Sequence, residues 1–247
     1  DPYTVVNEGR WTLDYVRKQT ADLGTDRNGD GKMDKYDSWG LATYQVNGMD
    51  NYMQGVYALC FENPGCYVEE GGNYDITYAV FKADRALYTT MMMSQVRTEL
   101  ADMESDFGIL PYPKLDETQS AYGTRVQDGL TIFAVPIDCQ KVEITGAVME
   151  AMAAENYRKV TPAVYDVAMK TKYSRDPASA AMIDLIQQSV LINFESIYNE
   201  SIGSPWFVMR DLMGKKSRDF TSYWASHVKK IERELGKAVE QIRAIDQ

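Results

Sequence analysis

Short apolar runs alternate with longer amphipathic segments along this chain, and this alternation limits the possible folds more than any other feature. Trp39–Tyr44 and Leu130–Val135 have the length and composition of buried strands, and Ala86–Thr90 and Phe107–Leu110 are shorter runs of the same kind. Segments with helical spacing lie between them. Strands that alternate with helices in this way predict an α/β fold.

The segments between the apolar runs repeat their apolar residues at helical spacing. The predicted helices are Thr4–Thr20, Gly48–Phe61, Ile76–Asp84, Ser94–Met103, Glu143–Tyr157 and about Phe220–Ala244. Two further helices are predicted to begin at Asp176-Pro177 and at Ser204-Pro205. In both, the polar side chain is expected to cap the helix, and proline takes the first helical position.

Charge and histidine content exclude several classes of function. The formal net charge of −10 argues against nucleic acid and anionic membranes as partners, because both select basic surfaces. No apolar run approaches the roughly 20 residues of a membrane-spanning helix. The single histidine, His227, excludes zinc sites built from several histidines and is the one candidate for a histidine-dependent mechanism. A solvated helical position is the more favoured interpretation of His227.

The three cysteines do not have the spacing of a zinc ribbon or a redox motif. Cys60 and Cys66 flank an Asn-Pro-Gly turn, a spacing that is compatible with a disulfide and equally with two buried thiols. Cys139 is expected to pack as a small hydrophobic side chain.

Residues 26–37 fit the twelve-residue calcium-loop pattern. The predicted ligands are the side chains of Asp26, Asn28, Asp30, Asp34 and Asp37 and the backbone carbonyl of Lys32, with Gly31 at the sharp turn. The loop lies between a helix and a strand, which favours a structural calcium site over a sensor, and Trp39 is expected to pack beneath it. The alternative is a turn rich in Asp and Asn that needs no metal.

Four segments in order resemble the extracellular solute-binding proteins of ABC importers. They are residues 9–14 followed by the calcium-type loop and Ser38–Leu41, then Phe81–Tyr88, Phe107–Lys114 and Gly146–Glu155. The similarity extends along essentially the whole chain, and it is greatest to the carbohydrate-binding branch, family 1 type, found as lipoproteins on Gram-positive bacteria.

The resemblance implies a type II periplasmic-binding-protein-like fold, with ligand held between two α/β lobes. Residues 1–126 would form the first part of the second lobe, residues 127–185 would return to the first lobe, and residues 186–247 would complete the second lobe. This chain then resembles the C-terminal part of such a receptor and is expected to bind weakly or not at all by itself. The family also implies an extracellular, lipid-anchored protein, with the anchor outside this sequence, that binds an oligosaccharide without catalysis and delivers it to permease subunits.

The resemblance also suggests which residues would contact the ligand. Trp206 matches a cleft-lining aromatic segment of maltodextrin receptors, and an ordinary core tryptophan is the alternative. The remaining candidates are Asp50, Asn51 and Tyr52, then Thr90, Met91 and Met92 after a strand, and Tyr122 and Asp128 beside the crossing segment. A calcium-stabilised, carboxylate-dependent glycoside hydrolase is the alternative function, although no motif singles out its pair of acidic residues.

Overall fold

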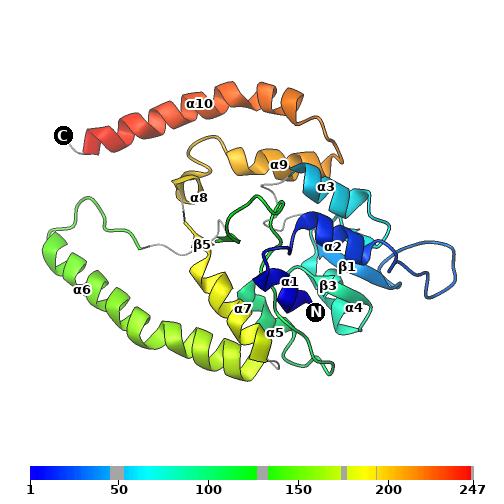
Figure 1. Cartoon of the computed structure of the whole chain (residues 1–247). Coiled ribbons are helices and arrows are strands. Elements are labelled where there is room, and N and C mark those ends of the chain that lie inside the picture. The colour runs from blue at the N-terminus through cyan, green and yellow to red at the C-terminus, as the bar shows by residue number, and fades with distance from the viewer. Residues whose placement is uncertain (45–52, 127–132, 174–176, 193, 246–247) are drawn as a thin grey trace.

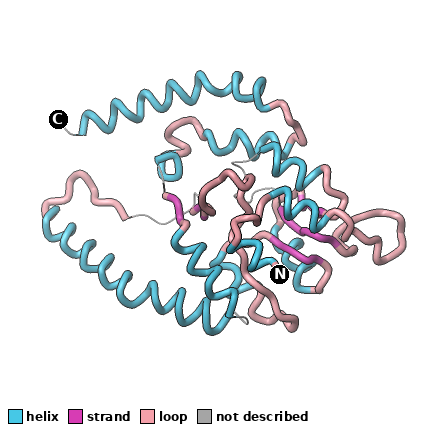
Figure 2. Tube along the Cα trace, in the orientation of Figure 1, coloured by secondary structure: helices cyan, strands magenta, loops and turns pink. Residues whose placement is uncertain are grey.

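The computed structural model describes residues 1–44, 53–126, 133–173, 177–192 and 194–245. Helices surround a small parallel sheet, and this arrangement confirms the predicted α/β class (Figures 1 and 2). None of the helices in the described part of the chain is both long and apolar enough to span a lipid bilayer.

Three parallel strands form the centre of the body. They are β1 (Trp39–Tyr44), β2 (Cys66–Glu69) and β3 (Ala86–Thr89), in the order β2-β1-β3. Leu41 of β1 pairs with Cys66 on one side and with Tyr88 on the other. Every residue of β1 is buried, as expected for a central parallel strand with helices on both faces. The strands predicted at Trp39–Tyr44 and Ala86–Thr90 are confirmed.

Helices cover both faces of this sheet. On one face, α2 (Leu13–Thr20) and α3 (Met53–Phe61) share a hydrophobic cluster with Leu41. On the other face, α4 (Tyr74–Lys82) packs Val80 against β1. Apolar side chains thus alternate between the two faces of the strand, and each face is covered by the apolar stripe of a helix.

The helix predicted over Thr4–Thr20 is wrong as a single element. The first helix, α1 (Pro2–Asn7), ends before Gly9, whose φ of +71° lies in the left-handed region that favours glycine. The next helix begins after Thr12, whose Oγ1 accepts a hydrogen bond from the backbone N–H of Tyr15 at 3.2 Å. The glycine and the capping threonine therefore separate the segment into two helices.

Two predicted strands are also wrong. Residues 107–110 form an extended loop in which the N–H of Ile109 donates to Ser179 Oγ at 2.9 Å, and two prolines follow directly. Of the run predicted at Leu130–Val135, residues 130–132 lie outside the described residues, and residues 133–135 are loop, with Phe133 66% exposed. An apolar run forms a buried strand only where a neighbouring strand and a covering layer are available, and no described strand lies beside this one.

The rest of the described chain, from residue 93 onward, is mainly helical. Its elements are α5 (Met93–Glu99), β4 (Thr124–Arg125), α6 (Val142–Glu155), the π-helical segments η1 (Asn156–Val160) and η2 (Ala163–Tyr173), α7 (Pro177–Gln188), β5 (Val190–Leu191), α8 (Phe194–Tyr198), α9 (Pro205–Gly214) and α10 (Phe220–Ile245). Strands β4 and β5 pair in parallel, and α10 packs on α9. The helices predicted in this part of the chain are found, although the one predicted to end at Met103 ends at Glu99.

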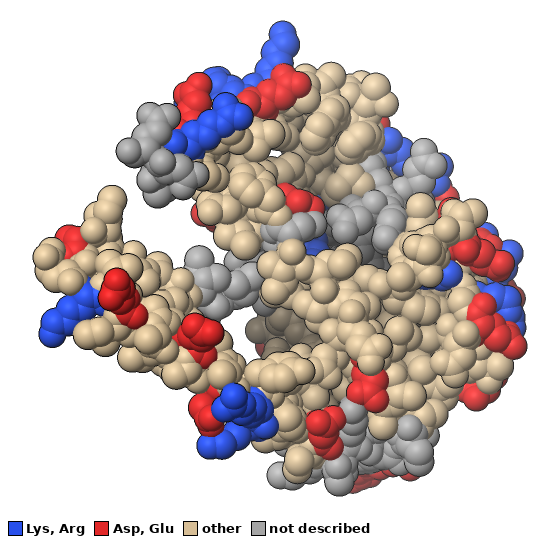
Figure 3. All heavy atoms as spheres, turned by 60° about the vertical axis from the view of Figure 1, so that its left-hand side comes forward, with Lys and Arg blue, Asp and Glu red and all other residues tan. Residues whose placement is uncertain are grey.

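Helix α6 projects from the α/β body, and no side chain on it is buried (Figure 1). The apolar side chains of α6 and of the following turns are largely in solvent, with Ile144 62%, Val148 52% and Tyr157 78% exposed. Figure 3 shows a mostly uncharged surface along this projecting limb, with charged side chains scattered over it. A helix that is apolar around most of its circumference is typical of a protein interior.

The packing of α2 on the sheet gives a test of the fold. A Cβ added at Gly65 would lie 1.6 Å from the carbonyl oxygen of Thr20, the last residue of α2. We expect Gly65→Ala to lower the free energy of unfolding by roughly 2 kcal/mol or more, because backbone must move to remove the overlap. Urea denaturation followed by circular dichroism measures the change.

Gly146→Ala on the exposed face of α6 is the matched control, because an added Cβ there meets no atom within 4 Å. This variant should show no loss of stability, since alanine favours the helix more than glycine does. Equal destabilisation by both substitutions would contradict the packing described for Gly65.

Candidate functional site

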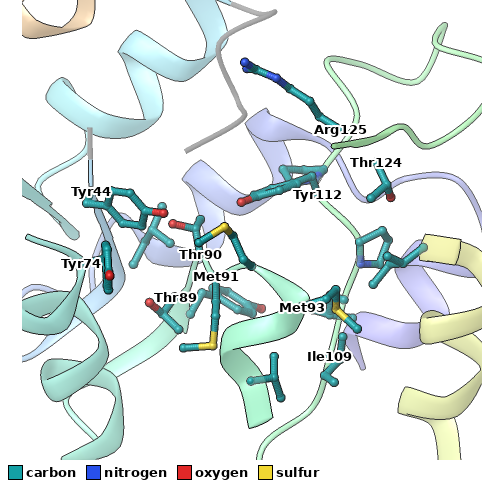
Figure 4. A pocket seen from close by; sticks show the side chains of 18 of the residues that line it. Tyr44, Tyr74, Thr89, Thr90, Met91, Met93, Ile109, Tyr112, Thr124 and Arg125 are labelled. Atoms are coloured by element: carbon teal, nitrogen blue, oxygen red, sulfur yellow. The ribbon is translucent and has the colours of Figure 1, made fainter. Parts of the chain in front are cut away.

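A cavity of about 630 Å³ opens at the carboxyl edge of the three-stranded sheet. Tyr44 at the end of β1 and Thr89 at the end of β3 both line it, together with residues 90–94 that follow β3. Figure 4 shows Thr89, Thr90 and Met91 side by side at this edge. In open α/β sheets, ligands bind at the carboxyl ends of the strands, so the position of the cavity makes it the leading candidate site.

Hydroxyl hydrogen bonds fasten the two strand ends beneath the cavity. The hydroxyl oxygens of Thr43 and Thr90 lie 2.6 Å apart and share a hydrogen bond, and both residues are buried. The hydroxyl of Thr89 donates to the carbonyl of Ala42 at 3.0 Å. These bonds satisfy polar groups that burial would otherwise penalise, and they fix the cavity floor to the sheet.

One wall of the cavity is aromatic. The rings of Tyr44 and Tyr74 have centroids 5.8 Å apart, and Tyr78 contacts both, at 6.5 Å from Tyr44 and 5.4 Å from Tyr74. Tyr78 donates its hydroxyl to Gln95 Oε1 at 2.6 Å. Glu69, at the end of β2, accepts hydrogen bonds from the backbone of the loop that leads into Tyr74. The wall is therefore positioned by the sheet and by the start of α4.

Aromatic and cationic side chains form the opposite wall. Arg125 of β4 places its guanidinium carbon 3.6 Å from the ring centroid of Trp206, and Arg210 of α9 lies 3.7 Å from the ring of Phe207. Arg125, Phe207 and Arg210 all line the cavity, and Figure 4 shows Tyr112 beneath Arg125. Cation–π contacts of this kind hold the planar guanidinium groups in place. Among the described lining residues, none is Asp or Glu.

The structure brings some of the sequence-predicted ligand residues to this cavity. Thr90, Met91 and Met92 line it. Trp206 is not one of the lining residues, but its ring contacts Arg125, which is. Tyr122 lies elsewhere, with its hydroxyl donating to the carbonyl of Val6 at 3.0 Å. The remaining candidates, Asp50, Asn51, Tyr52 and Asp128, lie outside the described residues.

The start of α9 differs from the predicted one in a single detail. The helix begins at Pro205, as the sequence indicated, but the Ser204 side chain makes no capping hydrogen bond. Asn199 Oδ1 accepts the N–H of Trp206 instead, at 3.1 Å. The cap therefore comes from the residue directly after α8, and it fixes the first turn of α9, which carries Trp206 and the cavity-lining Phe207.

His227 lies on α10, on the helical surface that the sequence indicated. Its Nδ1 is 2.8 Å from both Ser226 Oγ and the carbonyl oxygen of Tyr223, and its ring stacks on Tyr223 with centroids 4.3 Å apart. It is not among the described residues that line the cavity.

The loop at residues 26–37 has the turn geometry that the sequence indicated. Gly31 has a φ of +78° at the expected sharp turn. Trp39 packs against the loop, as predicted, and its Nε1 donates to the carbonyl of Asp34 at 2.9 Å. The Asp26 carboxylate accepts the N–H groups of Gly29 and Gly31. The loop lies at the amino end of β1, at the opposite sheet edge from the cavity.

Asp37 is the predicted ligand at the twelfth and last position of the loop, and backbone N–H groups donate hydrogen bonds to both of its carboxylate oxygens. Asp37 is fully buried and accepts the N–H of Asp34 at 2.7 Å and that of Arg27 at 2.9 Å. These two bonds lower the pKa of Asp37, because they favour the ionised carboxylate. In the described residues, no three Asp, Glu, His or Cys side chains converge as a metal site. The described geometry is that of a turn stabilised by its own Asp and Asn side chains.

Comparisons of the chain with models of protein families, with curated proteins and with solved structures found no match.

Most of the cavity walls were missed by sequence reasoning. Tyr44 ends a strand that was predicted correctly, so its place at the carboxyl edge could have been inferred. Tyr74, Tyr112 and Phe207 arrive from a helix start, a loop and a second helix, and no local pattern connects them. The chain has 17 tyrosines, and their number does not indicate which of them line the cavity.

The buried tyrosine wall predicts a loss of stability at alkaline pH. Burial raises the pKa of Tyr44 and Tyr78 above the ordinary value of 10.0. Above about pH 10 these phenols ionise in the unfolded chain while they stay neutral in the fold, so stability is lost as pH rises. Tyr78→Phe should make this loss smaller, at a cost near neutral pH of roughly 1 kcal/mol for its hydrogen bond.

Urea denaturation at about pH 8 and about pH 11 measures the difference. Tyr36→Phe is the control, because the Tyr36 side chain is 58% exposed and its replacement should leave the pH dependence unchanged. The explanation fails if Tyr78→Phe and the parent chain lose stability equally.

Proposed function

We propose that this chain binds an extracellular oligosaccharide and delivers it to the permease of an ABC transporter. The observation that carries the ligand class is the set of tyrosine rings that line the cavity, Tyr44, Tyr74 and Tyr112, beside the hydroxyls of Thr89 and Thr90 at the carboxyl edge of a parallel sheet. Sugars present apolar C–H faces and many hydroxyl groups, so aromatic rings and short polar side chains suit them. No chemical step is assigned to the cavity.

The same cavity gives less support to the glycoside hydrolase alternative. That mechanism needs two carboxyl groups roughly 5 to 10 Å apart around the scissile bond. The described residues that line the cavity include two arginines and no carboxylate. Binding without catalysis is therefore the better-supported function for this surface.

The projecting helix α6 supports the two-lobed, type II periplasmic-binding-protein-like fold. In this proposal, residues 127–185 belong to a first lobe, while residues 1–126 and 186–247 belong to the second. Val142, Ile144, Val148 and Met152 are between 46% and 62% exposed, whereas apolar side chains on all sides of a helix favour a position within a packed domain. A first α/β lobe packed around α6 would bury them and close over the ligand.

Delivery to a permease, the extracellular location and the lipid anchor rest on the resemblance of the ordered sequence segments to importer receptors. The net charge of −10 agrees with a protein whose own surface does not bind anionic lipid. In this proposal, the chain reaches the membrane through an anchor outside these residues and through its permease partner.

We also propose that residues 26–37 bind calcium as a structural ion. The oxygen-bearing side chains of Asp26, Asn28 and Asp30 occupy alternate positions of one tight turn, in which Asn28 Nδ2 donates a hydrogen bond to Asp30 Oδ2 at 3.2 Å. Hard oxygen donors at this spacing suit Ca²⁺, and Asp34, Asp37 and the Lys32 carbonyl would complete the set. The ion would stabilise the entry to β1.

Calcium should raise the melting temperature of the chain, and a chelator should lower it, because an ion that binds only the folded state stabilises that state. Asp26→Asn keeps a side-chain oxygen that can accept the hydrogen bonds of the turn, but it removes one negative charge from the predicted ligands. The rise in melting temperature caused by calcium should therefore be smaller in this variant. Differential scanning calorimetry measures both effects, with magnesium as the control ion. Identical melting temperatures with calcium and with chelator would exclude the site.

Ligand binding is tested by saturation-transfer difference NMR with a panel of oligosaccharides, a method suited to the weak affinity expected of one lobe. Tyr74→Ala removes an aromatic platform and should lower the transfer by at least about fivefold, since one lost ring contact is worth about 1 kcal/mol or more. Tyr36→Ala, on the calcium-type loop, is the matched control and should bind normally.

Saturation transfer that is absent for every sugar, or unchanged in Tyr74→Ala, would refute the proposed site. Hydrolysis of a chromogenic glycoside that disappears on substitution of one Asp or Glu would establish the hydrolase alternative instead.

A further inference from the structure

Two thiols lie together in the core beneath the sheet. Cys60 is in the last turn of α3, and Cys66 is the first residue of β2. The chain reverses direction between them: the N–H of Cys66 donates to the carbonyl of Asn63 at 3.1 Å, and the N–H of Gly65 donates to the Asn63 side chain at 3.1 Å. Both cysteines belong to one hydrophobic cluster, with exposures of 6% and 8%.

The two thiol groups are neighbours within this cluster. The neighbouring Cys60 thiol, together with burial, raises the pKa of the Cys66 thiol. A protonated thiol is a poor nucleophile, so the pair should react slowly once it is buried. Cys139 is half-buried and contacts Thr145 Oγ1 at 3.5 Å. Any pairing of the core thiols therefore takes place while the chain folds.

We propose that Cys60 and Cys66 form a disulfide when the chain folds in the presence of a small disulfide oxidant such as oxidised glutathione. One cysteine thiolate first attacks the oxidant and releases one molecule of reduced glutathione. The other then attacks the resulting mixed disulfide, forming the Cys60–Cys66 bond and releasing a second. Two thiol protons and two electrons leave the protein, and one oxidised glutathione becomes two reduced ones.

The bridge would join the end of α3 to the start of β2, next to the contact between Gly65 and α2. A short closed loop restricts the unfolded chain, so oxidation should raise the melting temperature by roughly 5 °C. Such a bond is stable in the oxidising compartments outside the cytoplasm. Both cysteines lie in the core and are not among the described residues that line the cavity.

The test uses the full chain with Cys139→Ser, so that only the two core cysteines remain. The protein is unfolded with reductant and then refolded with oxidised and reduced glutathione, or with reductant alone. We expect the first sample to contain no free thiol after denaturation and to be lighter by two hydrogen atoms. Cleavage after Glu62, which lies between the cysteines, should give two peptides that separate only on reduction.

Cys60→Ser in the same background is the matched control and should show a glutathione adduct and no oxidation-dependent rise in melting temperature. The unsubstituted chain, mapped by the same cleavage, should show the same link if Cys139→Ser has not disturbed folding. Two free thiols per chain after oxidative refolding, or glutathione attached to each cysteine without a link between them, would overturn the proposal.

Discussion

The α/β body depends on the close approach of Thr20 to Gly40 of β1 and to Gly65 in the turn before β2. A Cβ at Gly40 would lie 2.4 Å from Thr20 Cβ, and one at Gly65 would meet the Thr20 carbonyl oxygen. Thr20 is fully buried, and its hydroxyl donates to the carbonyl of Val16 at 2.8 Å and accepts the side-chain amide of Asn63 at 2.7 Å. The end of α2 thus joins β1 to the turn before β2 without leaving its hydroxyl unsatisfied.

The packing of α2 on β1 determines where the candidate site lies. With β1 held at its amino end by α2 and joined to β3 through Thr43 and Thr90, the strand ends form a fixed floor. The loops and α9 then add walls from distant parts of the chain, and Arg125 on Trp206 links two of them. A site whose floor is rigid and whose walls are loops and helix ends can change specificity without altering the sheet.

Sequence reasoning succeeded where burial is decided locally. All six residues of Trp39–Tyr44 are buried, and the strand forms where predicted. It failed where burial depends on elements that are distant in the sequence. Phe133, in the apolar run predicted as a strand, is 66% exposed because no described strand or helix covers it. Gly9 broke a continuous helical pattern through its backbone conformation. The candidate site was anticipated at Met92 but not at Tyr74, because walls assembled from separate elements leave no periodic signal.

Strand β1 has one further consequence. Its first residue follows the Asp-rich loop and its last residue enters the cavity, so the strand separates them by roughly 20 Å at about 3.3 Å per residue. Substitutions in the loop therefore leave the residues that line the cavity in place, and the reverse also holds. The two ends of one strand are thus free to diverge independently over evolutionary time.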